Sequence, residues 1–213
     1  MLRSIEVISD ERVGQGGFLL LRRMRLRLVR ADGTRTAEGI WDYVERPVGL
    51  DAVVVALFRN RAAPEVLLRH GVRVPVQFGR PHAAALLLPE LVAGIIERGE
   101  EGDEAVRERA AAEALEEAGL HIDPRSVEAL GPPMFPSPGM TAEQFHFVCA
   151  EVPDGARAVR PAGDGSPFEE GARLEWVPLD EALRRCARAE IQDLKTEAGL
   201  RRLREKLGAP QSA

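Results

Sequence analysis

A cluster of glutamates near the middle of the chain constrains its fold more than any other feature. The segment from Glu90 to Leu120 reads ELVAGIIERGEEGDEAVRERAAAEALEEAGL and ends in strongly helix-forming residues. Positions i, i+3 and i+4 share one face of an α-helix, so Glu113, Glu116 and Glu117 point roughly the same way. Like charges at this spacing repel, and Mg²⁺ or Mn²⁺ relieves the repulsion because both take carboxylate oxygens and bridge to phosphate. The segment therefore predicts a metal-dependent phosphate site.

Glycines surround this cluster. Gly94, Gly99, Gly102 and Gly119 allow loop backbone to approach the helix closely, because glycine has no β-carbon. Gly119 also fits a helix C-terminus, and Asp103 is a candidate N-cap. The alternative interpretation is an ordinary surface helix with a solvated acidic face. The flanking glycines and the motifs that follow favour the metal site.

The two ends of the segment resemble the Nudix hydrolase box. That box reads glycine, five residues, glutamate, seven residues, then Arg-Glu-aliphatic-x-Glu-Glu-x-Gly-aliphatic. Here five residues separate Gly94 from Glu100, and residues 113–120 read EALEEAGL. Eleven residues stand where the family has seven, and Ala112 replaces the arginine. Four extra residues make about one helical turn, so the longer helix keeps its metal face. Arg109, four residues before the first ligand glutamate, can replace the missing arginine as charge partner of the cluster.

Length and composition limit the class of protein. The 213 residues fit one α/β domain, or a core domain with a small N-terminal addition. A net charge of −5 argues against non-specific nucleic-acid binding. Cys149 and Cys186 make neither a disulfide framework nor a zinc site, and Cys149 is expected to be a small buried residue. Because no signal sequence and no long apolar run are present, we expect a soluble, cytoplasmic protein with no membrane partner.

The order of apolar patterns predicts the fold. By resemblance to the Nudix fold, we expect an α/β/α sandwich with a mixed sheet, preceded by an N-terminal antiparallel β ribbon. The chain then divides into the ribbon, residues 1–47, and a Nudix hydrolase domain, residues 48–213. We expect strands over 18–29, 34–44, 53–58, 66–68, 86–88, 91–93, 145–152 and 174–177, helices over 103–118, 179–189 and 195–207, and a long loop over 153–171.

Motifs outside the box resemble the ADP-ribose pyrophosphatase branch of the family. Residues 90–94 resemble its Glu-Leu-(Pro or Val)-Ala-Gly sequence, and Ser137-Pro138-Gly139 followed by Glu143 resembles its Ser-Pro-Gly segment. Ile191-x-Asp193-x-Lys195-Thr196 resembles its C-terminal helix motif. The resemblance covers roughly residues 15 to 207. It implies Mg²⁺-dependent hydrolysis of the pyrophosphate of ADP-ribose or a related nucleoside-diphosphate sugar, with Mn²⁺ as the other candidate metal.

The resemblance also implies roles for single residues. Glu113 and Glu117 are expected to ligate the metal, with Glu116 assisting and the Ala93 carbonyl adding a neutral oxygen ligand. Glu97 either joins this metal shell or is a surface glutamate.

The catalytic base of this branch lies on a loop after the strand over 145–152. Glu169 and Glu170 occupy the matching stretch here, in Ser-Pro-Phe-Glu-Glu-Gly. A base on a mobile loop completes the site only when substrate is bound. The alternative is a pair of exposed loop acids.

Substrate contacts are expected from both parts of the chain. Arg73, in Arg-Val-Pro, resembles the family's Arg-x-Pro arginine that binds phosphate, with Arg69 as the fallback. Phe18 or Trp41 can stack on a nucleobase or simply pack within the ribbon. Glu143 is expected among the substrate-binding residues.

The ribbon predicts an assembly. Its apolar residues exceed what a lone hairpin can bury, since two-stranded units are marginal in water. By resemblance we expect a homodimer in which Arg46 of one subunit reaches the site of the other. The simpler alternative is a monomer whose ribbon packs on its own domain.

Two other functions compete with the preferred one. A sister enzyme would keep the chemistry but act on UDP-glucose, GDP-mannose or a dinucleotide, and no residue visibly distinguishes the bases. A catalytically weak Nudix domain would only bind a nucleotide sugar. Ala112 and the four-residue insertion are the features that favour this last alternative.

Overall fold

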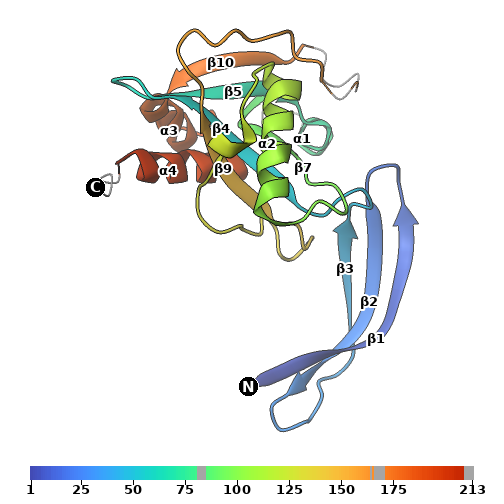
Figure 1. Ribbon diagram of the computed structural model, residues 1–213. Helices are drawn as coiled ribbons and strands as arrows, with labels where there is room; N and C mark the ends of the chain where they lie inside the picture. Colours follow the sequence, from blue (N-terminus) through green and yellow to red (C-terminus); the bar gives the residue numbers. More distant parts are fainter. Residues whose placement is uncertain (81–84, 164, 166–170, 209–213) are drawn as a thin grey trace.

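The computed structural model describes residues 1–80, 85–163, 165 and 171–208. A mixed β-sheet lies between helices on both of its faces, and a smaller antiparallel sheet extends from this body as an arm (Figure 1). Within the described residues, the main sheet contains β4 (Ala52–Arg59), β5 (Glu65–Val72), β6 (Leu87–Glu90), β7 (Val92–Ile95), β8 (Glu128–Ala129), β9 (Phe145–Glu151) and β10 (Arg173–Pro178). The helical elements are α1 (Val74–Gly79), α2 (Gly102–Ala118), η1 (Pro124–Ser126, a 3₁₀ turn), α3 (Leu179–Ala187) and α4 (Leu194–Gly208).

The strands of the main sheet run in the order β10-β5-β4-β9-β8. Among the described strands of this sheet, only β4 and β9 run parallel, and the other neighbours are antiparallel. Strand β4 is buried along almost its whole length because helices cover both faces of the sheet. This explains why its sequence is a continuous apolar run rather than an alternating one.

Side chains of β4 alternate between two cores. Val54 and Ala56 pack with residues of α3 and α4, such as Leu200, on one face. Val53 and Val55 pack on the other face against α2, which presents Ala110, Ala114 and Ala118. The predicted α/β/α arrangement with a mixed sheet is therefore confirmed. Cys149 of β9 is 1% exposed, and its predicted burial is confirmed as well.

The ends of α2 differ in how well sequence predicted them. Gly119 adopts a left-handed conformation with φ 66°, and its N–H donates to the Leu115 carbonyl, so the predicted stop is confirmed. The predicted N-cap at Asp103 was wrong. Glu101 occupies that position without a side-chain cap, and Asp103 lies in the first turn, where its charge complements the helix dipole.

A divergence between β4 and β5 creates room for the candidate site. The two strands pair only at Phe58 with Val66 and at Arg59 with Glu65. Beyond this point β6 pairs with β5, and β7 pairs with β4. Only Leu91 separates β6 from β7, so the chain crosses from one side of the opening to the other within a residue.

The arm is a three-stranded sheet in which β1 (Leu2–Gln15), β2 (Leu20–Arg30) and β3 (Gly39–Glu45) lie in that order. Sequence predicted the strands over 18–29 and 34–44, confirmed as β2 and the shorter β3, and it missed β1. Three register shifts interrupt the pairing of β1 with β2, and such bulges destroy the alternation that marks a strand in sequence. The Val44 N–H donates to the Met140 carbonyl at 2.8 Å and ties the base of the arm to the body.

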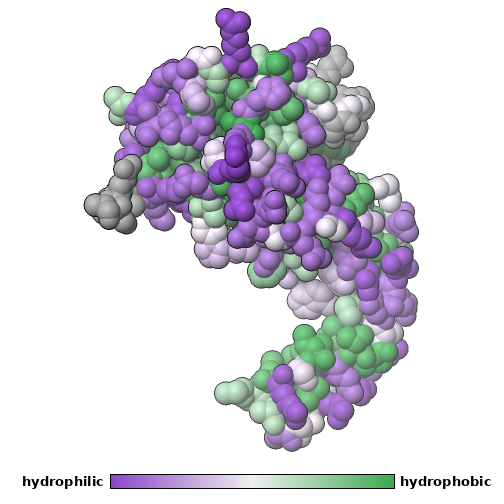
Figure 2. All heavy atoms as spheres, in the orientation of Figure 1, coloured by the Kyte–Doolittle hydropathy of each residue, from purple (hydrophilic) through white to green (hydrophobic). Residues whose placement is uncertain are grey.

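The two faces of the arm differ in character. On one face Arg23 pairs with Asp42, and the neighbouring Arg25 and Arg27 both pair with Glu38. On the other face Ile5, Val7 and Trp41 are more than half exposed beside β2. Figure 2 shows hydrophobic residues gathered on the part of the arm far from the body, and mostly hydrophilic residues nearer to it.

Short elements escaped prediction because they carry too few residues for a periodic pattern; these are α1, η1 and β8. None of the described helices has the length and apolarity needed to cross a membrane.

Candidate active site

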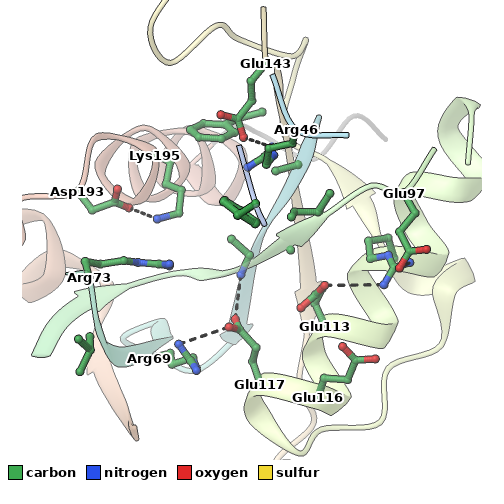
Figure 3. A pocket seen from close by; sticks show the side chains of 18 residues that line it. Arg46, Arg69, Arg73, Glu97, Glu113, Glu116, Glu117, Glu143, Asp193 and Lys195 are labelled. Atoms are coloured by element: carbon green, nitrogen blue, oxygen red, sulfur yellow. Dashed lines mark hydrogen bonds and ion pairs between the residues drawn. The ribbon is translucent and has the colours of Figure 1, made fainter. Parts of the chain in front are cut away.

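A pocket of about 620 Å³ opens where β5, β7, α2 and the start of α4 meet the base of the arm (Figure 3). Its lining residues are Phe18, Arg46, Ala52, Arg69, Val72, Arg73, Ala93, Gly94, Ile95, Glu97, Arg109, Glu113, Glu116, Glu117, Glu143, Phe145, Asp193 and Lys195. Carboxylates of α2 form one wall of the pocket, and cationic side chains of β5 and α4 form the opposite wall.

The acidic wall consists of Glu113, Glu116 and Glu117. Glu113 is 8% exposed and lies against β7. A β-carbon on Gly94 would lie only 1.6 Å from the Glu113 Oε1, so glycine is the residue that admits this carboxylate. The Ala93 N–H donates to the Glu117 Oε2 at 3.1 Å. The expected close approach to the glutamate helix is confirmed for Gly94, whereas no atom lies within 4 Å of a β-carbon at Gly99 or Gly102.

Arg109 is the charge partner of the glutamates near the start of the box. Its Nη2 lies 2.8 Å from the Glu100 Oε1 and 3.4 Å from the Glu97 Oε1. Its Nη1 lies 4.0 Å from the Glu113 Oε1. The hydrogen bond from Arg109 holds the pKa of Glu100 below its ordinary value. Of the three glutamates that end the segment, Arg109 therefore reaches Glu113, and its shorter contact is with Glu100.

The acidic wall has the donor chemistry that a hard divalent cation requires. Glu113, Glu116 and Glu117 offer carboxylate oxygens to the pocket, and Ala93 of β7 lines it beside them. In their present positions, no three carboxylate, histidine or cysteine side chains of the described residues enclose a metal ion. Arg109 lies 4.0 Å from Glu113. Glu117 forms an ion pair with Arg69 and accepts a hydrogen bond from the Ala93 N–H. A bound cation would replace these contacts.

The basic wall consists of Arg69, Arg73 and Lys195. The Arg69 Nη1 lies 3.4 Å from the Glu117 Oε1, so it spans the pocket toward the acidic wall. Arg73 donates from Nε and Nη2 to Glu90 at 2.8 and 2.5 Å, and this hydrogen bonding raises the pKa of Arg73. Arg73, which was expected to bind phosphate, and its fallback Arg69 line the same pocket.

The base of the arm forms the mouth of the pocket. Arg46 bonds to the Leu50 carbonyl at 2.7 Å and forms an ion pair with Glu143. Its guanidinium carbon lies 5.9 Å from the centre of the Phe18 ring. Of the two aromatic candidates, Phe18 lines the pocket, whereas Trp41 does not line it and is 54% exposed on the arm. Arg46 was expected at a partner subunit's site; it lines the pocket of its own chain.

The loop acids proposed as the base, Glu169 and Glu170, lie outside the described residues. Described residues on both sides of them, including Gly165 and Gly171, line a neighbouring cavity of about 560 Å³. This cavity shares Glu116 and two other residues with the main pocket. The described flanks of the loop therefore border the acidic wall.

In the sequence, Asp193 and Lys195 stand out only as parts of a motif, and no motif indicates a function for Glu90. The structure places Asp193 and Lys195 in the pocket lining and joins Glu90 to both Arg73 and Lys195. These contacts connect residues up to 105 positions apart.

Comparison with known proteins gives structural but not sequence similarity. No protein-family model matches the chain, and no curated protein sequence is similar to it. The fold is similar to that of a solved structure described as "Crystal structure of ADP compounds hydrolase", with a TM-score of 0.69. The match covers 97% of this chain and 96% of that one, at 17% sequence identity. At this identity the likeness establishes the fold, which includes the arm because nearly the whole chain is covered.

Proposed function

We propose that the protein is a Nudix-type hydrolase of the pyrophosphate in ADP-ribose or a related nucleoside-diphosphate sugar. The products are a nucleoside monophosphate and a sugar phosphate. The observation that carries the proposal is the meeting, in one pocket, of the carboxylates of α2 with Arg69 and Arg73. Hydrolysis of a pyrophosphate needs both groups. The arginine side chains bind its phosphate oxygens, and the carboxylates hold the metal ion that activates it.

In this proposal Glu113 and Glu117, with Glu116 and the Ala93 carbonyl, hold Mg²⁺. When bound, Mg²⁺ neutralises charge that develops on the phosphate oxygens and lowers the pKa of a bound water. Mn²⁺ has a similar preference for oxygen ligands and can substitute.

The protein's own groups orient the substrate. Arg73 directs part of its guanidinium into the pocket while Glu90 fixes its Nε and Nη2. Bidentate contact with phosphate suits its planar fork. Glu169 or Glu170 accepts the proton of the attacking water, as the family resemblance implies.

The nucleoside end of the substrate is assigned to the mouth of the pocket. Phe18 offers an aromatic face for a base, and Arg46 and Glu143 offer a donor and an acceptor beside it. The solved neighbour is a hydrolase of ADP compounds by its description, which favours an adenine nucleotide.

We also propose that the protein is a homodimer formed through the arm. The exposed apolar face that includes Ile5, Val7 and Trp41 supports this, because contiguous apolar surface of this kind marks interaction sites. In a dimer with two-fold symmetry, the apolar face of one arm would pack against the same face of the other, so that both would be buried.

Monophosphate release from a panel of nucleoside-diphosphate compounds with Mg²⁺ tests the function. The panel includes ADP-ribose, UDP-glucose, GDP-mannose and a dinucleotide. We expect the fastest release from ADP-ribose or a close relative. Tight binding of a nucleotide sugar without turnover would instead identify a binding domain.

A further inference from the structure

Lys195 is unusual because the chain hardly uses lysine. Among 29 lysine and arginine residues, only Lys195 and Lys206 are lysines. Lys206 lies on α4 and pairs with Glu128 at 2.7 Å, with a third of its side chain exposed. The Lys195 side chain is only 11% exposed, lines the pocket, and directs its ammonium group into it (Figure 3).

Two carboxylates hold the Lys195 ammonium group. The Nζ lies 2.7 Å from the Glu90 Oε2 and 2.8 Å from the Asp193 Oδ2. Asp193 is fixed in turn, because it accepts hydrogen bonds from the Thr196 N–H at 3.0 Å and from the Thr196 hydroxyl at 2.5 Å. The Thr196 hydroxyl accepts from the Leu91 N–H at 2.9 Å. The ammonium group is therefore anchored to the crossing between β6 and β7.

One buried carboxylate positions two cations. Glu90 is 6% exposed and binds both Arg73 and Lys195. Burial alone raises the pKa of Glu90, but the hydrogen bonds from Arg73 and the charge of Lys195 outweigh it and hold the pKa below its ordinary value. Glu90 thus stays ionised at neutral pH and keeps both cations in place.

Each cation retains hydrogen-bonding capacity toward the pocket. An ammonium group has three donors, and within the described part of the chain the hydrogen bonds of Lys195 go to Glu90 and Asp193. Arg73 bonds to Glu90 through Nε and Nη2, which leaves its Nη1 edge on the pocket side. An anion between Lys195 and Arg73 would accept hydrogen bonds from both of these fixed cations.

We propose that Lys195 is a substrate-binding residue whose ammonium group, beside Arg73, binds a phosphoryl oxygen, and that Glu90 and Asp193 position it. A compact ammonium group can bond to two carboxylates and still donate to a third acceptor, whereas a planar guanidinium cannot adopt that arrangement as readily. This explains a lysine at this position in a chain that otherwise favours arginine. The inference deepens the proposed function, and it rests on that function for the identity of the phosphate compound.

Selective isotope labelling tests the contact directly. With ¹³C-labelled lysine the intact protein has two lysine side-chain signals, and Lys206→Arg identifies which is which. Inorganic pyrophosphate and a methylene-bridged ADP-ribose analogue, each with Mg²⁺, are the probes. We expect a saturable shift of the Lys195 Cε signal and no shift for Lys206. An unmoved Lys195 signal at saturating concentrations of both probes would overturn the inference.

Affinity measurements separate binding from a structural role. Lys195→Met should weaken binding of the methylene-bridged analogue by roughly 10- to 100-fold, as expected for loss of a charge-assisted hydrogen bond. Lys206→Met should leave binding unchanged. Thermal melting of both variants monitors folding, and Lys195→Arg provides a second, charge-preserving variant. A lower melting temperature for Lys195→Met with unchanged affinity would assign Lys195 to fold stability alone and reject the inference.

The inference and the proposed function can fail separately. A ligand-induced Lys195 shift without turnover of any nucleoside-diphosphate compound would retain the anion site and reject the hydrolase. Turnover of ADP-ribose with no Lys195 shift would retain the hydrolase and reject the anion site.

Discussion

The Glu113 carboxylate packs against the backbone of Gly94, so closely that a β-carbon at position 94 would meet its Oε1 at 1.6 Å. Gly94 is the first glycine of the glutamate-rich segment, and Glu113 lies on α2, the helix at the end of that segment. A β-carbon there would also lie 1.9 Å from the Glu113 Cδ and 2.5 Å from its Cγ, so Gly94→Ala should displace the whole Glu113 side chain. A single added methyl group at position 94 should therefore move a carboxylate of the acidic wall.

We predict that Gly94→Ala lowers kcat by about 10²-fold, the range expected when a charged group at a metal site is misplaced. The melting temperature should fall as well, because Glu113 is 8% exposed and its displacement disturbs the packing of α2 on β7. Gly39→Ala is the matched control, since no atom lies within 4 Å of a β-carbon there and its φ is not positive. Full activity of Gly94→Ala would show that the position of Glu113 is unimportant for turnover.

Arg109 should make stability depend on pH. Its hydrogen bond holds the pKa of Glu100 below the ordinary value of 4.5. A carboxyl group with a lowered folded-state pKa stabilises the fold above its unfolded pKa, and loses this contribution as pH falls through the folded pKa. Arg109→Met should therefore be less stable than the wild type at pH 7, and the difference should shrink below pH 4.5.

Urea unfolding at pH 7 and at pH values below 4.5 measures this difference. Arg107→Met, on the same helix and outside the pocket lining, is the control and should show no comparable pH dependence. A stability difference that grows on acidification would contradict the assignment of Arg109 as the partner of Glu100.

The loop acids should control chemistry rather than binding. We predict that Glu169→Gln or Glu170→Gln slows turnover by ~10²- to 10⁴-fold, the usual contribution of a general base. Affinity for a non-hydrolysable analogue should be almost unchanged. If both single variants remain fully active, the base must be sought elsewhere, and Glu143 is the next candidate because it lines the pocket.

The arm should hold two subunits together. Sedimentation of the wild type at micromolar concentration should give a dimer, whereas a variant combining Ile5→Asp and Trp41→Asp should be monomeric, because both side chains lie on the exposed apolar face. Arg23→Gln, on the charged face, is the control. A single wild-type species near 23.3 kDa with full activity would reject the dimer.

Sequence predicted the parts of the fold that local patterns determine. The apolar runs of β4 and β9, the glutamate-rich α2 and its glycine stop were all recognisable, because each carries its signal within a few residues. Strand β1 was missed since its bulges break the alternation. The N-cap was misplaced by two positions, from Glu101 to Asp103, because acidic residues occur both before and within the first turn.

The candidate site was predictable only in part. The glutamates of α2 and Arg73 belong to motifs, and Arg109 could be chosen from its helical spacing. The link from Glu90 to Lys195 spans 105 residues and depends on how α4 packs beside the crossing of β6 and β7, which no local pattern reveals. Likewise, only the three-dimensional arrangement shows that Phe18, rather than Trp41, reaches the pocket.

The rate of monophosphate release from ADP-ribose, with and without Mg²⁺, tests the central claim most directly. Glu113→Gln and Glu117→Gln should each lower kcat by at least ~10²-fold, because each removes charge from a metal ligand. Glu104→Gln, an exposed residue on the same helix, should retain wild-type turnover. Near-normal turnover by either of the first two variants at saturating Mg²⁺ would contradict a metal site on this wall of the pocket.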